Sequence, residues 1–253
     1  MSFAIVVVPA APLRKKPSHK KEITNQLLFG EIMRVMKQKK NWSLIQSVHD
    51  FYRGWIRNNL IRQIDENLAA PSSFLAASLV NTIEINGEKM QIPFAANLPQ
   101  FKNNKGCIAK VDYIFNGYAV NRNLSQPLAG EIKELAMQWL NAPYLWGGRT
   151  IFGVDCSGFT QVIFKMLGFD LLRDAKQQIT QGMKVKSLKQ ARCGDLAFFK
   201  KKGKIVHVGI LLSHQQIIHA SGKVRIDSID EKGIIHAETG VRTHLLAAIK
   251  RYW

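Results

Sequence analysis

Short stretches in which apolar and polar residues alternate fill the first half of the chain, and glycine or charged turns separate them. Alternation over so few residues predicts short, half-buried strands, and several such strands with polar turns between them predict a small barrel. Residues 1–62 are therefore expected to form an all-β barrel with strands at Phe3–Val8, Gln26–Glu31, Ile32–Met36, Trp42–Gln46 and Gly54–Ile56.

A short helical linker is predicted over residues 61–69, and strand-like runs return over residues 73–121. Within this region Asn86-Gly87 is a typical hairpin turn between two strands. We interpret residues 63–126 as a second, divergent barrel that does not repeat the sequence of the first. Its expected strands are Phe74–Val80, Ile83–Ile85, Met90–Phe94 and Cys107–Val111.

The pattern changes from Pro127 onward, where helical periodicity comes first and strands follow. Residues 128–140 carry apolar side chains at 132, 135, 136, 139 and 140, which predicts an amphipathic helix. The apolar positions 159, 162, 163, 166 and 167 predict a second helix. A loop and a short helix are expected over 172–183, and then strands near 196–199, 204–212, 216–220, 224–228 and 245–250. Helices followed by a meander of strands indicate an α+β domain over residues 127–253.

Cys156 lies between a glycine-rich loop and the second predicted helix. Asp155 precedes it and is a suitable N-cap, and a helix N-terminus favours an anion. This placement predicts a lowered thiol pKa and a nucleophilic thiolate. The alternative is that Cys156 is a small buried hydrophobe, which is the commoner role of a lone cysteine.

Two histidines follow on predicted neighbouring strands, His207 within 204–212 and His219 within 217–222. Antiparallel pairing would bring them to adjacent positions. His207 is then a candidate base for the Cys156 thiol, and His219 is a candidate for the residue that orients the His207 ring. Each could instead be a packed or solvated strand residue, but the combined order of cysteine and two histidines favours nucleophilic catalysis.

Five motifs in this order resemble the NlpC-type papain-like cysteine peptidases, which cleave bacterial cell-wall peptides. They are PYLWGG at 143–148, VDCSGF at 154–159, GDL at 194–196, HVG at 207–209 and IHASG at 218–222. The N-terminal strands resemble a bacterial SH3-like domain. The resemblance therefore implies two small all-β SH3-like barrels followed by an α+β papain-like cysteine peptidase domain.

Proteins of this kind with two SH3-like domains resemble the γ-D-glutamyl-L-diamino-acid endopeptidases of murein peptide recycling. The resemblance implies cleavage between D-Glu and the diamino acid in a murein tripeptide or longer stem that has a free N-terminal L-Ala. It also implies that His219 is the third member of the catalytic triad. Tyr144 is a candidate second donor to the oxyanion, beside the Cys156 N–H.

The same resemblance implies a set of substrate contacts. Asp174, Glu31 and Tyr52 would hold the L-Ala ammonium, because carboxylates and a hydroxyl are its natural partners. Asp155 and Ser157 would contact the bound dipeptide. Some relatives carry Ser where this chain has Ala175, so only the backbone of Ala175 could serve. The plainer alternatives are a surface charge for Glu31, a surface aromatic for Tyr52 and an N-cap for Asp174.

Composition narrows the remaining possibilities. The net charge is +18, but its 36 basic residues are spread along the chain without a nucleic-acid motif, so we expect no nucleic-acid role. Three cysteines at scattered positions do not suggest a disulfide framework, and no metal-binding motif occurs, so neither a metal nor another cofactor is expected. No apolar run is long enough for a membrane span.

The first nine residues resemble a strand more than a signal peptide. We therefore expect a cytoplasmic protein, with a periplasmic or exported protein as the alternative if a signal segment was removed. Separately, we expect a monomer. Two other functions stay open from the sequence. One is a peptidoglycan-binding module with a degenerate peptidase, and the other is an amidase or acyltransferase that uses the same cysteine.

Overall fold

The computed structural model describes residues 2–124 and 129–253 and divides into two compact units. One unit is Met1–Ser125 together with Trp146–Ile151, and the other is Gln126–Leu145 together with Phe152–Trp253. The short segment Trp146–Ile151 thus belongs to the N-terminal unit, although it lies in sequence between two parts of the C-terminal one. Among the described residues, no helix is long and apolar enough to cross a membrane.

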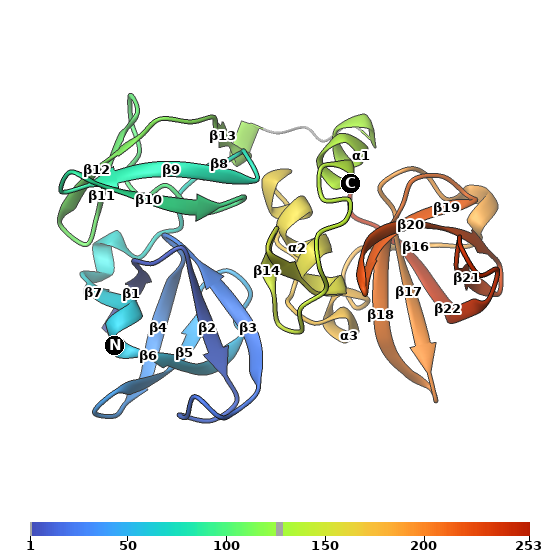
Figure 1. The fold of residues 1–253 in the computed structure, drawn as a ribbon, viewed down its shortest axis with the longest axis horizontal. Helices are drawn as coiled ribbons and strands as arrows, with labels where there is room; N and C mark the ends of the chain where they lie inside the picture. The colour runs from blue at the N-terminus through green and yellow to red at the C-terminus, as the bar shows by residue number, and fades with distance from the viewer. Residues whose placement is uncertain (1, 125–128) are drawn as a thin grey trace. The chain divides into compact units, whose positions relative to one another are not determined.

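The first sheet of the N-terminal unit follows the order β3-β2-β6-β5-β4-β1-β7 (Figure 1). Alternating side chains of its strands enter a core that includes Leu13, Met33 and Ile45. The strands predicted from alternation are present here, and β2 was not predicted. The bounds are β1 (Ser2–Val6), β2 (Ala10–Arg14), β3 (Ile23–Leu28), β4 (Ile32–Gln38), β5 (Trp42–Ser47), β6 (Arg53–Arg57) and β7 (Ile61–Ile64).

The predicted helical linker over 61–69 is wrong in its first half. Ile61–Ile64 forms strand β7, which pairs antiparallel with β1, and only Glu66–Leu68 makes a single 3₁₀ turn. The error arises because β7 forms by pairing with a strand about sixty residues earlier in the chain, and local periodicity carries no signal of such a long-range pairing. Further 3₁₀ turns lie at Asn58–Leu60 and Arg122–Leu124.

The rest of the N-terminal unit holds a sheet in the order β10-β9-β12-β11 and the pair β13-β8. The predicted turn at Asn86-Gly87 joins β9 to β10. Side chains of this region, such as Ile83 and Phe115, share one core with Phe3 and Phe29 of the first sheet. The bounds are β8 (Phe74–Ala76), β9 (Val80–Ile85), β10 (Glu88–Pro93), β11 (Lys105–Ile108), β12 (Val111–Phe115) and β13 (Ala119–Asn121).

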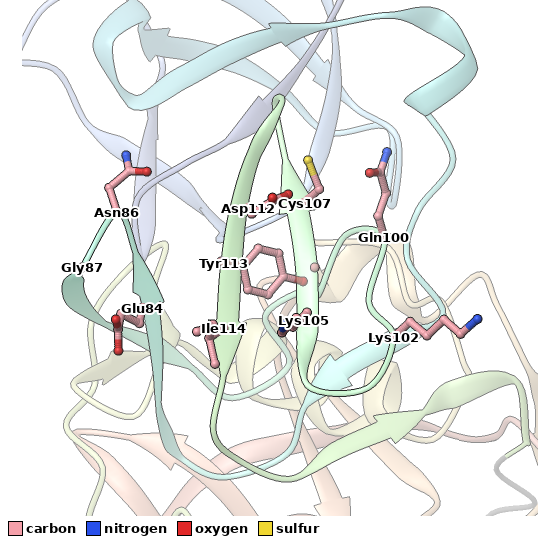
Figure 2. A pocket seen from close by; sticks show the side chains of 11 residues that line it. Glu84, Asn86, Gly87, Gln100, Lys102, Lys105, Cys107, Asp112, Tyr113 and Ile114 are labelled. Atoms are coloured by element: carbon pink, nitrogen blue, oxygen red, sulfur yellow. The ribbon is translucent and has the colours of Figure 1, made fainter.

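A hollow of about 600 Å³ lies along strands β11 and β12. Figure 2 shows Tyr113 between these strands, with Cys107 and Asp112 at one end of the hollow. Burial and a hydrogen bond with Asp112 raise the pKa of the Cys107 thiol. Cys107 is therefore kept as a thiol.

The C-terminal unit places helices before an antiparallel sheet, as the periodicity predicts. The sheet follows the order β16-β22-β17-β18-β19-β20-β21, with a further pairing of β22 and β21. The described bounds are α1 (Ala129–Met137), β15 (Gly153–Val154), α2 (Cys156–Met166), α3 (Ala175–Gln178), β16 (Met183–Val185), a 3₁₀ turn (Leu188–Gln190), β17 (Leu196–Lys201), β18 (Lys204–Leu211), β19 (Gln216–Ser221), β20 (Lys223–Asp230), β21 (Gly233–Ile235) and β22 (Arg242–Arg251). Strand β14 (Arg149–Thr150) belongs to the N-terminal unit.

Helix α2 is the central element of this unit. Every residue from Cys156 to Met166 is buried, including the polar Gln161 and Lys165, and the helix packs against β18 and β19. The predicted helix over 128–140 corresponds to α1, and its first residue, like the predicted domain start at Pro127, lies outside the described residues.

Candidate active site

The N-terminus of α2 places the predicted nucleophile as the sequence suggests. Asp155 is the N-cap, and its Oδ1 accepts a hydrogen bond from the Gly158 N–H at 2.7 Å. Cys156 is the first residue of the helix and is 6 % exposed. The backbone N–H of Val208, the neighbour of His207, hydrogen-bonds its sulfur and favours the thiolate. The N-cap therefore holds Cys156 at the start of α2, and the Val208 hydrogen bond holds its sulfur against strand β18.

A buried arginine that the sequence analysis did not single out holds the residues on either side of Cys156. Arg173 Nη1 and Nη2 donate to the two oxygens of Asp155 at 2.9 and 2.6 Å. Nη1 also donates to Ser157 Oγ at 3.0 Å. Arg173, Asp155 and Ser157 are all buried. Both predicted dipeptide contacts, Asp155 and Ser157, are thus fixed by one guanidinium, which also compensates the Asp155 charge.

The two predicted histidines meet in a buried chain of hydrogen bonds. His207 Nε2 lies 2.8 Å from His219 Nδ1, and His219 Nε2 lies 3.0 Å from Asp227 Oδ2. Strands β18 and β19 pair antiparallel as expected, with Ile210 opposite Ile218. A side chain at Gly209 would come within 2.8 Å of His219 Cβ, so the glycine of the HVG motif leaves room for this histidine.

Aromatic rings enclose His207 on strand β18. The ring of His244, from β22, stacks on His207 with centroids 4.3 Å apart and planes at 27°. Phe199 of β17 lies opposite His207 in the sheet and packs at 5.8 Å between ring centroids. His219 meets the His207 ring edge-on. These contacts leave the imidazole little freedom to rotate.

The lowered thiol pKa predicted for Cys156 is wrong for this buried site. Burial raises the pKa of Cys156 to about 12, and the Asp155 charge adds to this, while hydrogen bonds from Val208 and Ser157 and the Arg173 charge only partly oppose it. Burial also lowers the pKa of His207 well below its usual value. The resting pair is therefore a neutral thiol and a neutral imidazole, and the proton has to move when the sulfur attacks.

These pKa directions predict how activity depends on pH. His207 can accept a proton only in its neutral form, and a lowered pKa keeps it neutral below pH 6.5. We therefore expect kcat/KM to hold its plateau down through pH 6.5 and to fall only at lower pH. A profile measured from pH 4 to 8 checks this, and an acidic midpoint at or above pH 6.5 would contradict it.

Folding must be monitored across the same range. Burial lowers the pKa of both His207 and His219. Below pH 6.5 these histidines therefore bind protons in the unfolded chain but stay neutral in the folded chain. Proton binding by these histidines therefore does not affect stability above pH 6.5, and each one that stays neutral in the folded protein lowers the free energy of unfolding by up to about 2 kcal/mol at pH 5. Circular dichroism at each pH separates this loss of folded protein from protonation of the base.

Tyr144, the predicted oxyanion donor, lies in the loop before α2, where its N–H donates to the Gly222 carbonyl. Burial raises the pKa of its hydroxyl, and the charges of Cys156 and Asp155 raise it further. The Tyr144 hydroxyl therefore stays protonated at neutral pH. Tyr144 can therefore donate a hydrogen bond to a developing oxyanion.

Asp174 and Ala175 stand at the start of α3. Asp174 is the N-cap residue, its N–H donates to Gln177 Oε1 at 3.0 Å, and its carboxylate lies 3.5 Å from Lys176 Nζ. The Asp174 side chain is 33 % exposed, so it remains open to a ligand. Ala175 is buried at the first helical position. The predicted roles of both residues in binding a substrate stay predictions.

Glu31 lies within the N-terminal unit and is not the surface charge that the plainer interpretation assumed. Its carboxylate is 1 % exposed and forms a bidentate ion pair with Arg149 at 2.8 and 2.9 Å. Glu31 Oε2 also accepts from the Leu28 N–H at 3.1 Å. Tyr52 is half-buried, and its hydroxyl donates to the Thr24 carbonyl at 3.4 Å. Glu31, which was predicted to bind the substrate ammonium, therefore already has the Arg149 guanidinium as its cationic partner.

Arg149 belongs to a loop that is anchored to strand β3. Its N–H and Nη1 donate to the side-chain and main-chain oxygens of Gln26, each at 2.9 Å. Trp146 Nε1 donates to Glu22 at 3.0 Å. Gly147 has φ +77°, and a side chain there would come within 3.0 Å of the Ile23 carbonyl oxygen. The lack of a side chain at Gly147 therefore lets this loop approach the β3 backbone closely.

A metal centre is not apparent in this site. No group of three or more His, Cys, Asp or Glu side chains gathers to hold an ion within residues 2–124 and 129–253. The cluster of His207, His219 and Asp227 is instead linked by direct hydrogen bonds.

Sequence models of two families match the chain. The NlpC/P60 family matches residues 141–243, and a bacterial dipeptidyl-peptidase Sh3 domain matches residues 13–60. A γ-D-glutamyl-L-lysine dipeptidyl-peptidase of Bacillus subtilis (strain 168) is 32 % identical over 222 residues, which cover 78 % of this chain and 72 % of that protein. A protein of the same name from Bacillus cereus is 25 % identical over 88 % of this chain and 76 % of its own length.

Among solved structures, an NlpC/P60 family protein from Bacillus cereus superposes with a TM-score of 0.84. It is 20 % identical in sequence, and the match covers 99 % of each chain. The likeness extends over the N-terminal strands and the C-terminal unit alike.

Proposed function

We propose that this chain, which belongs to the NlpC/P60 family and is a cell-wall peptidase, is a cysteine endopeptidase specific for murein peptides with a free N-terminal L-Ala. It hydrolyses the bond between D-Glu and the diamino acid and serves the recycling of cell-wall peptides. The observation that carries the proposal is the buried chain from His207 through His219 to Asp227 beside the Cys156-bearing helix α2.

The reaction proceeds through a thioester. Cys156 Sγ attacks the γ-carbonyl carbon of D-Glu while His207 takes the thiol proton. The resulting oxyanion accepts hydrogen bonds from the Cys156 N–H and the Tyr144 hydroxyl. The C–N bond then breaks, His207 returns the proton to the departing amine of the diamino acid, and water hydrolyses the thioester to release L-Ala-γ-D-Glu.

The residues around Cys156 bind the acyl side of the substrate. Ser157 and Asp155 are held in place by Arg173, so their remaining hydrogen-bonding capacity is presented in a fixed geometry. A buried polar group that is fixed in this way discriminates between ligands that satisfy it and ligands that leave it unpaired. We assign these two side chains to the bound dipeptide.

We assign Asp174 to the L-Ala ammonium, and the ammonium contacts expected for Glu31 and Tyr52 stay predictions. Arg149 compensates Glu31, whereas Asp174 is partly exposed and lies 3.5 Å from the solvent-exposed side chain of Lys176, which a ligand can displace. The net attraction for an ammonium therefore comes mainly from Asp174.

The proposal predicts that the amine must be free. Acetylation of L-Ala removes the charge, and losing a hydrogen bond to a charged group costs about 1.5–3 kcal/mol, or roughly ten- to a hundredfold in rate. Asp174→Asn is expected to slow the free peptide by a similar factor and to leave the acetylated peptide almost unchanged. Initial rates for the two peptides with both enzymes measure this.

Asp170→Asn is a matched control, because Asp170 is an exposed aspartate shortly before Asp174 in the chain. It should affect neither peptide. Equal rates for free and acetylated peptides would exclude the ammonium requirement while leaving the cysteine mechanism intact. No turnover of either peptide would favour the alternative of a peptidoglycan-binding module, and products formed by transfer to another acceptor would favour an acyltransferase.

A further inference from the structure

The chain of hydrogen bonds from His207 does not end at a histidine, and its last member determines where the protons lie. Asp227 is buried on β20, and its Oδ2 accepts from His219 Nε2 and from Arg225 Nε, each at 3.0 Å. Its Oδ1 accepts from the Ala237 N–H at 3.0 Å. Burial alone would raise the pKa of Asp227, but these hydrogen bonds outweigh it and hold the pKa well below its usual range.

An ionised carboxylate can only accept, so each neighbour of Asp227 is a donor. His219 therefore carries its proton on Nε2, and as a neutral imidazole it has a bare Nδ1. That Nδ1 lies 2.8 Å from His207 Nε2, so His207 has to donate from Nε2. His207 is then left with a bare Nδ1, which is the nitrogen that can accept a proton.

We propose that Asp227 is a positioning residue that fixes the tautomers of His219 and His207 and so leaves His207 Nδ1 free to take the Cys156 proton. Asp227 touches neither substrate nor sulfur and acts through two imidazoles in series. The inference rests on the proposed function for its kinetic test, whereas its test by spectroscopy needs no substrate.

Asp227→Asn changes the proton pattern with little change in shape. The amide offers a single oxygen where the carboxylate offered two. The Ala237 N–H cannot give up its proton, and the Arg225 side chain can turn toward solvent because it is 20 % exposed. Only His219 can exchange a donor for an acceptor, by moving its proton from Nε2 to Nδ1. His207 is then forced to accept at Nε2 and to carry its proton on Nδ1, where it can no longer act as a base.

The expected result is a fall in kcat of about 10²- to 10⁴-fold in Asp227→Asn, the range that a general base contributes, with KM nearly unchanged. Alkylation of Cys156 by iodoacetamide at pH 7, followed by peptide mapping, should slow as well. Nitrogen-15 NMR of the histidine rings should show both His207 and His219 protonated on Nε2 in the unaltered protein, and both on Nδ1 in the variant.

Asp230→Asn is the matched control. Asp230 lies on the same strand and forms an ion pair with Arg242, and within the described residues its hydrogen bonds go to Lys232, Gly233 and Arg242 rather than to His207 or His219. It should keep kcat, the alkylation rate and the ring protonation of the unaltered protein. The proposal is overturned if Asp227→Asn keeps kcat and the alkylation rate within about threefold of Asp230→Asn, or if His207 is protonated on Nδ1 in the unaltered protein. Should the murein peptide not be cleaved at all, the NMR and alkylation results still decide the role of Asp227.

Discussion

Cys156→Ala is expected to abolish peptide hydrolysis, with kcat reduced by more than about a thousandfold, because no other group can form the acyl intermediate. The substitution removes one sulfur atom from the first residue of α2 and leaves the Asp155 cap and the Arg173 contacts in place. The fold should therefore persist. Initial rates, together with thermal unfolding of the same preparations, measure both effects.

The other two cysteines provide the control. Burial raises the pKa of both Cys107 and Cys193, and neither has a histidine chain beside it in the structure as described. Cys107→Ala and Cys193→Ala should keep full activity. Hydrolysis that survives in a clean Cys156→Ala preparation would refute the cysteine mechanism.

Arg149→Met is expected to destabilise the N-terminal unit by about 3–5 kcal/mol, the cost of leaving one member of a buried ion pair without its partner. Arg149 and Glu31 are both fully buried, so the remaining Glu31 carboxylate cannot turn to solvent. The variant also loses the hydrogen bond from Nη1 to the Gln26 carbonyl. Urea unfolding followed by hydrogen–deuterium exchange would assign the loss to this unit.

Two comparisons make the result specific. The double variant Glu31→Leu/Arg149→Met should recover much of the lost stability, because replacing a whole buried pair with apolar groups is often neutral. Arg242→Met removes a half-exposed partner of Asp230 and should cost far less, because solvent screens that pair. If Arg149→Met and Arg242→Met are equally mild, the buried pair does not stabilise the fold as argued.

The sequence was sufficient to predict that Cys156 starts a helix and that His207 and His219 lie on neighbouring strands, because each has a local signal. A capped helix start follows a glycine-rich loop, and two apolar strands each carry one histidine. The strands of the N-terminal unit were found in the same way, from alternation within a few residues. The existence of two separate SH3-like barrels and the boundary near residue 62 stay predictions.

Residues whose role depends on long-range contacts were missed. Arg173 and Arg149 find their partners 18 and 118 residues away, and nothing local marks them as buried. Asp227 had a usable signal. Gly222 forms a tight turn that pairs Ser221 with Lys223, and this register places residue 227 diagonally across from His219 on the same face of the sheet. The direction of the Cys156 pKa was wrong because the N-cap is a local feature, whereas burial depends on the whole fold.

The central claim is that this chain cuts between D-Glu and the diamino acid. Mass spectrometry of the products from L-Ala-γ-D-Glu-diamino acid tripeptide, with Cys156→Ala as the blank, tests it most directly. The account predicts two products, the dipeptide L-Ala-γ-D-Glu and the free diamino acid. Release of free L-Ala, or a tripeptide that the intact enzyme leaves uncut, would contradict it.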